Sequence, residues 1–109
     1  MKKVESTNDT KLIVFEDGDK APSLDELKEY VKRGATGCAS VGWIEIVTIQ
    51  RDSKFAKIGD QLIVNEMGHV EGLPINQKAT DIYWSTCISG TVSFIVGDCV
   101  HLTGSARLT

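Results

Sequence analysis

The chain has 109 residues, of which 41% are hydrophobic and 25% are charged, a composition typical of one folded domain and not of a disordered segment. Its formal net charge is −3, so the molecule as a whole repels the phosphate backbone, and we expect no general binding to duplex nucleic acid. No stretch approaches the roughly eighteen apolar residues of a membrane helix, and no apolar region follows Lys2 and Lys3, so we expect a cytoplasmic protein.

The first half of the chain predicts a strand and a helix. Residues 1–10 are polar, and we expect a flexible N-terminal segment there, followed by one domain over 11–109. Residues 11–16 (KLIVFE) read as a strand. Ser23 and Glu26 then form a capping box, in which each side chain bonds to the backbone amide of the other residue. Apolar residues at helical spacing follow, and Gly34 is the expected end of this helix.

The middle of the chain predicts three strands. Residues 43–49 (WIEIVTI) are rich in β-branched residues and apolar on both faces except at Glu45, which indicates a central strand. A charged, hairpin-like link over 51–60 leads to a strand at 61–65, and after a turn residues 69–73 are expected to return alongside it.

The last third predicts a second helix and two closing strands. Asn76 can cap a shorter helix over 76–84 through its side-chain oxygen, and strands are expected at 91–96 and 99–103, separated by Gly97 and Asp98. The resulting order, β-α-β-β-β-α-β-β, predicts a single compact α+β domain with a mainly antiparallel sheet and both helices on one face.

The cysteines and histidines form no recognisable motif. Cys38, Cys87 and Cys99 are odd in number and too widely spaced for a metal site, so we expect reduced thiols. His69 and His101 are isolated from other residues at metal-ligand spacing. We therefore expect no metal and no cofactor.

Several segments together resemble one family. They are residues 42–47 (GWIEIV), 64–80 (VNEMGHVEGLPINQKAT) and 95–98 (IVGD). The chain is similar over about residues 10–103 to a small domain family of unknown function from bacteriophages and mobile elements, whose members carry a Gly-x-Ile-Glu strand, an Asn-Glu-x-Gly turn and an Asn-x-x-Ala-Thr helix start. Members often show paired glycines where this chain has Val41 and Gly42. The resemblance implies a phage-like origin, the host cytoplasm and no settled activity.

The polar residues of 62–80 are the main candidates for a ligand site. Asn65 and Glu66 either shape a turn or offer an amide edge and a carboxylate to a base. Asn76 and Thr80 either cap a helix or, together with Lys78, present donors to an anion.

Other candidates lie outside that block. Trp43 and Trp84 are either core aromatics or stack on a planar ligand. Glu45 either faces solvent or has a partner, since a buried carboxylate is otherwise costly. Arg51 begins a basic run with Lys54 and Lys57, which is either a solvated loop or a phosphate clamp.

These residues lead us to expect a non-catalytic protein that binds a small anionic ligand, and the family resemblance implies that it is a phage protein that sequesters this ligand. A signalling nucleotide of the cyclic oligonucleotide class is the expected ligand, and withholding it would block bacterial antiviral defence; small phage proteins of this size include such sponges. We expect Asn65 and Asn76 to converge at one rim of the sheet, and a homo-oligomer to deepen the pocket. The alternatives are a module that inhibits a host protein through its acidic surface, and a small hydrolase or lyase that uses Glu45 or Glu66 with His69.

Overall fold

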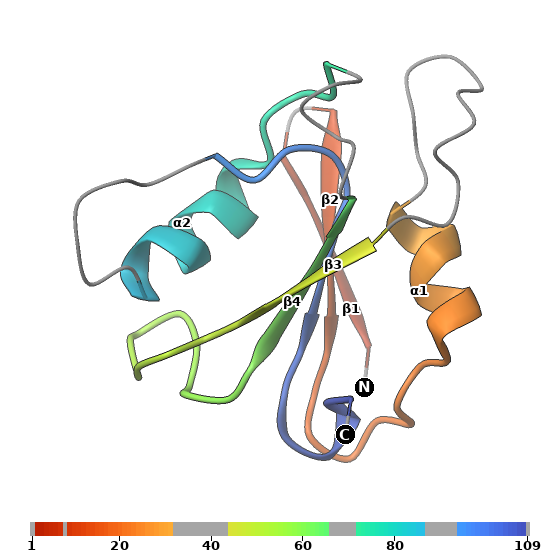
Figure 1. Cartoon of the computed structure of the whole chain (residues 1–109), viewed down its shortest axis with the longest axis vertical. Helices are drawn as coiled ribbons and strands as arrows, with labels where there is room; N and C mark the ends of the chain where they lie inside the picture. The colour runs from red at the N-terminus through yellow and green to blue at the C-terminus, as the bar shows by residue number, and fades with distance from the viewer. Residues whose placement is uncertain (1, 8, 32–43, 66–71, 87–93, 109) are drawn as a thin grey trace.

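A mixed sheet runs through the middle of the molecule (Figure 1). The computed structural model describes residues 2–7, 9–31, 44–65, 72–86 and 94–108. The strand order is β1-β2-β5-β4-β3, and only the pair of β2 and β5 is parallel among these neighbours. The prediction of an α+β fold with a mainly antiparallel sheet is therefore confirmed. The strands are β1 (Lys3–Thr7), β2 (Thr10–Phe15), β3 (Ile44–Thr48), β4 (Gln61–Asn65) and β5 (Cys99–Leu102).

Helices cover both faces of the sheet, so the expectation of helices on one face was wrong. Leu27 and Val31 of α1 (Leu24–Val31) pack with Ile13, Ile63 and Val100. On the other face, α2 (Gln77–Thr86) packs against the alternate strand residues; its Ala79 and Ile82 join Leu12, Leu62, Val64 and Cys99. Successive strand residues point to opposite faces, and Figure 1 shows the sheet between the two helices.

Both helices begin where the capping signals predicted. Ser23 Oγ accepts the Glu26 amide hydrogen at 3.2 Å, and the Ser23 amide donates to the Glu26 carboxylate at 3.4 Å, which completes the capping box before α1. At α2, Asn76 Oδ1 accepts the Ala79 amide hydrogen at 3.1 Å. The expected end of the first helix at Gly34 lies outside the described residues.

The N-terminal segment is a strand, not the flexible tail that its polar composition predicted. β1 pairs antiparallel with β2, and Val4 lies opposite Ile13. Lys3 also forms an ion pair with Glu16 at 2.7 Å. An edge strand is held by backbone hydrogen bonds to one neighbour, so it forms here without a continuous apolar face.

The expected central strand lies at an edge. β3 pairs with β4 alone among the described strands, and Ile46 at its middle is 44% exposed. The centre is β5, whose four residues are all buried between β2 and β4. β-branched residues favour a strand wherever it lies, so composition did not distinguish edge from centre.

Two expected strands are not seen as strands where the structure describes them. The segment 69–73 lies mostly outside the described residues. Of 91–96, the described part contributes one isolated bridge, in which Val96 pairs with Ile75. Gly97 follows with φ of +76°, a conformation that strains any residue with a Cβ atom, and a Cβ atom there would also lie 2.7 Å from the Leu73 side chain and displace it, so glycine is favoured at this turn.

Candidate functional site

The structure does not bring the two expected asparagines together. Asn65 donates to the Val31 carbonyl at 3.0 Å, on the face that α1 covers. Asn76 lies at the start of α2, on the opposite face, where its amide donates to the carbonyls of Lys11 and Gly97, both at 2.9 Å. The predicted convergence is wrong, because these amides bond to backbone on different sides of the sheet.

Thr80 is likewise engaged with backbone. Its hydroxyl accepts the Ile95 amide hydrogen at 2.9 Å and donates to the Ile95 carbonyl at 3.3 Å. Asn76 and Thr80 are both almost fully buried. They join α2 to the segment before β5. Of the two roles expected for these residues, the hydrogen bonds therefore support the structural one and not ligand binding.

The remaining candidates are scattered. Glu45 is exposed on β3, so its charge needs no buried partner. Arg51 donates through Nε to the Ser85 carbonyl at 3.1 Å, and Lys78 pairs with Glu5 at 3.2 Å. Trp84 packs against Phe94, with ring centroids 5.2 Å apart. Trp43 and Glu66 lie outside the described residues.

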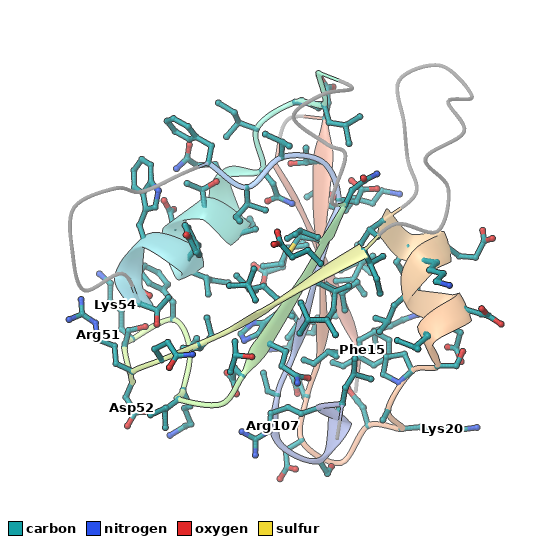
Figure 2. All side chains as sticks on the ribbon, viewed as in Figure 1. Phe15, Lys20, Arg51, Asp52, Lys54 and Arg107 are labelled. Atoms are coloured by element: carbon teal, nitrogen blue, oxygen red, sulfur yellow. The ribbon has the colours of Figure 1, made fainter. Side chains whose placement is uncertain are left out.

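A groove forms on the α2 face, beside the helix. The connection between β3 and β4 folds back beneath α2 (Figure 1). It is tied there by the Gln50 amide, which donates to Thr86 Oγ1 at 2.9 Å, and by the Ser53 and Ser85 hydroxyls, which lie 2.9 Å apart. Ala56 is buried in the core below, and these contacts hold Lys54 and Phe55 beside the groove. Figure 2 shows Arg51, Asp52 and Lys54 on this side of the sheet and Phe15 on the side of α1.

The groove consists of two adjoining hollows, which share Lys54, Phe55 and His101. We call the first, of about 460 Å³, the lysine hollow, and the second, of about 360 Å³, the β1 hollow. Asp17, Ser53, Ala56, Lys57, Asp60, Thr103 and Gly104 complete the lysine hollow. Glu5, Leu12, Val14, Lys78, Asp81 and Ile82 complete the β1 hollow.

His101 and Asp60 form a buried pair within the groove. His101 Nε2 lies 3.0 Å from Asp60 Oδ2, and each side chain is 6% exposed. His101 lies opposite Val14 of β2 and Leu62 of β4, which places its ring on the α2 face. Because the carboxylate accepts, Nε2 carries the hydrogen and Nδ1 of the neutral ring keeps the lone pair. Among the described residues, no protein atom hydrogen-bonds to Nδ1.

The carboxylates of the lysine hollow already have donors. Asp60 Oδ2 also accepts the Lys57 amide hydrogen at 3.1 Å. Asp17 Oδ1 accepts the Ser105 amide hydrogen at 2.7 Å, and the hydrogen bonds from Ser105 hold the pKa of the Asp17 carboxyl below its usual range.

The lysines of the lysine hollow have no partner of opposite charge among the described residues, whereas its carboxylates have hydrogen-bond donors. Lys54 Nζ lies 5.1 Å from the centroid of the Phe55 ring, a contact that does not neutralise its charge. In the described parts of the chain, neither Lys54 nor Lys57 has a carboxylate within ion-pair distance. The hollow therefore presents positive charge that an anion can satisfy.

The sequence left Lys54 and Lys57 as either a solvated loop or a phosphate clamp, and it did not single out Asp60, Phe55 or His101 as part of a site. One signal was present: His101 lies within the otherwise apolar run of 99–102, and a polar ring in a buried strand requires a hydrogen-bond partner. That partner is 41 residues away in sequence, so only the tertiary structure identifies it.

Other kinds of site find no support in the described residues. Nowhere in them do three or more His, Cys, Asp or Glu side chains gather in a way that could hold a metal ion. Cys99 is a buried free thiol, and burial raises its pKa, which disfavours the reactive thiolate. A search for membrane-spanning helices over the same residues found none of sufficient length and hydrophobicity.

Comparisons of the chain with protein-family models, with curated proteins and with solved structures gave no match. The groove is therefore the feature from which a function can be inferred.

Proposed function

We propose that the protein binds a small anionic molecule in the groove without transforming it. The observation that carries this proposal is the pair of cationic residues, Lys54 and Lys57, that line a hollow whose own carboxylates are already hydrogen-bonded. A partly enclosed anion gains more from such groups than it does at an open surface, because less water screens the charges. Both hollows fall within the size range of small-molecule sites.

A nucleotide is the ligand class that we propose. Its phosphate would lie at Lys54 and Lys57, while the base would pack on Phe55 or on the apolar floor of Leu12 and Val14. Asp81 lines the β1 hollow. Its Oδ1 accepts a hydrogen bond from Gln77 at 2.8 Å, and the carboxylate can accept a further one from an exocyclic amine of the base. Lys78 keeps its predicted role as a donor to the ligand, although it must share its charge with Glu5.

The biological form of this proposal is sequestration. The likeness of residues 42–47, 64–80 and 95–98 to a phage family supports a protein that retains a signalling nucleotide, of the cyclic oligonucleotide class, in the cytoplasm of an infected cell. A second copy of the chain would deepen an open groove of this kind. Direct inhibition of a host protein is the competing proposal.

A panel of cyclic mononucleotides and cyclic oligonucleotides tests this function by isothermal titration calorimetry. Replacing both Lys54 and Lys57 by alanine should weaken the binding of any retained nucleotide by at least about tenfold, equivalent to about 1.4 kcal/mol. The matched control replaces Lys20 and Lys28, of which Lys20 is exposed and Lys28 lies on α1. It removes the same total charge away from the groove and should leave affinity within about twofold, because exposed charges act weakly at a distance.

Analysis of the bound nucleotide separates the competing functions. Recovery of the intact molecule supports sequestration. Recovery of a hydrolysed product supports a second candidate, acid–base catalysis, which the geometry of His101 and Asp60 favours because a carboxylate that orients an imidazole is a common catalytic arrangement. Failure of every nucleotide to bind contradicts the proposal and favours a protein target.

A further inference from the structure

We infer that anion binding in the lysine hollow is coupled to protonation of His101, so that the protein holds its ligand more tightly as the pH falls. This inference rests on the proposed function and adds a mode of regulation to the same site. Its starting point is the position of His101, whose ring lines both hollows while one of its nitrogens is bonded to Asp60.

The imidazole can accept a second proton without losing its present contact. Neutral His101 donates through Nε2 to Asp60 at 3.0 Å. Protonation at Nδ1 preserves that hydrogen bond and turns it into a contact between opposite charges. The new N–H group at Nδ1 can then donate to water or to a ligand in the groove.

The burial of the ring opposes its charged form, and the charges around the ring add to or offset that opposition. Asp60 favours the imidazolium, while the ammonium groups of Lys54 and Lys57 oppose a further positive charge in the same hollow. Charged groups from each element around the groove contribute to this balance. In the described part of the chain, those that line the groove are Lys54, Lys57 and Asp60 from the β3–β4 connection, Lys78 and Asp81 from α2, Glu5 from β1, and Asp17 from the turn after β2. Arg107, which donates through Nε to the Gly104 carbonyl at 3.0 Å, adds a positive charge next to the lysine hollow.

An anion changes this balance in one direction. When an anion binds Lys54 and Lys57, it cancels the charges that oppose protonation and adds negative charge beside His101. Glu5 and Lys78 are already paired with each other at 3.2 Å, so they contribute little to the change in the electrostatic environment of His101 when the anion binds. Binding and protonation are linked equilibria, so an anion that favours the imidazolium must itself bind more tightly once the ring is charged.

Sulfate is a suitable probe, because it remains a dianion over the pH range in which histidine titrates, near 6.5 in unperturbed peptides. Any change in bound protons then belongs to the protein. The ring C–H resonances of the two histidines are followed by NMR from pH 5 to 8, and His69→Gln identifies those of His101. We expect sulfate to raise the midpoint of the His101 titration by about 0.5 to 1 pH unit relative to sodium chloride of equal ionic strength. This shift corresponds to sulfate affinity about 3 to 10 times higher at pH 5 than at pH 8.

The variant with alanine at both Lys54 and Lys57 should abolish the shift, and the Lys20 and Lys28 control should preserve it. Backbone amide shifts at Lys54 and Lys57 report sulfate binding independently of His101. If sulfate moves these amides but leaves the His101 midpoint unchanged, the coupling is overturned and the anion site stands. If sulfate moves neither, there is no anion site, and the proposed function fails together with the coupling.

Discussion

At the scale of single residues, Asn76 and Thr80 of the polar block are structural. Asn76 combines a helix cap with two hydrogen bonds to the carbonyls of Lys11 and Gly97, and Thr80 forms two more with Ile95. Buried backbone groups must be bonded, and here side chains satisfy groups that the sheet leaves unpaired. The same residue types would suit a ligand site, so identity alone did not separate the two roles.

Asn76→Ala should lower the free energy of unfolding by about 2 to 4 kcal/mol, more than the roughly 1 kcal/mol of a lost cap, because two carbonyls also lose their donor. Asn76→Ser is the matched variant, since it keeps a capping oxygen but cannot reach both carbonyls, and it should be intermediate. Urea unfolding measures both. A loss of less than about 1 kcal/mol for the alanine variant would show that the carbonyl bonds contribute little.

At the scale of elements, the local signals at helix starts were reliable and the strand patterns were less so. The capping box at Ser23 and the cap at Asn76 act within one turn of chain, so sequence spacing determines them. The position of a strand in the sheet depends on its partners. The apolar β3 lies at one edge and the polar β1 at the other.

Ser23→Ala should destabilise the protein by about 0.5 to 1.5 kcal/mol, because the Glu26 amide loses its acceptor at the exposed start of α1. Ser6→Ala, at an exposed position on β1, is the control and should change stability by less than about 0.5 kcal/mol. Thermal unfolding followed by circular dichroism measures the difference. Equal effects of the two substitutions would mean that the capping box does not stabilise the fold.

At the scale of the whole molecule, the turn after β2 connects the two ends of the chain. Glu16 pairs with Lys3 of β1, and Asp17 accepts the amide hydrogen of Ser105 in the short helix η1 (Gly104–Ala106). The side-chain hydrogen bond from Lys3 lowers the pKa of the Glu16 carboxyl, and the hydrogen bonds from Ser105 lower that of Asp17. Both carboxylates thus favour the folded state when they are charged.

Stability should therefore fall as the solution is acidified. A carboxyl whose pKa is lower in the folded than in the unfolded state stabilises the protein fully above its unfolded value, near 4, and loses this contribution as the pH falls through the folded value. Urea midpoints at pH 7 and pH 3 should differ less in Asp17→Asn than in the parent protein. Asp9→Asn, at an exposed position, is the control. An unchanged difference between pH 7 and pH 3 in Asp17→Asn would exclude this carboxyl as a source of acid sensitivity.

The amino-acid sequence by itself determined the α+β class, the hairpin-like link between 43–49 and 61–65, and the starts of both helices. These features follow from interactions between residues near one another in the chain, such as the Ser23 and Glu26 capping box. The edge strand β1 was missed, because its backbone hydrogen bonds to β2 leave no apolar pattern in the sequence.

Only the tertiary structure decided which face each helix covers and where a ligand could bind. Residues 12–13, 62–63 and 99–100 are apolar on both faces, so each face was equally suited to a helix and the pattern carried no preference. The groove forms where His101 lies beside Asp60 and Lys54. His101 is 41 residues from Asp60 in the sequence, and a turn separates Asp60 from Lys54. Such a site forms only when distant segments of the chain pack together, and no local pattern of residues predicts that packing.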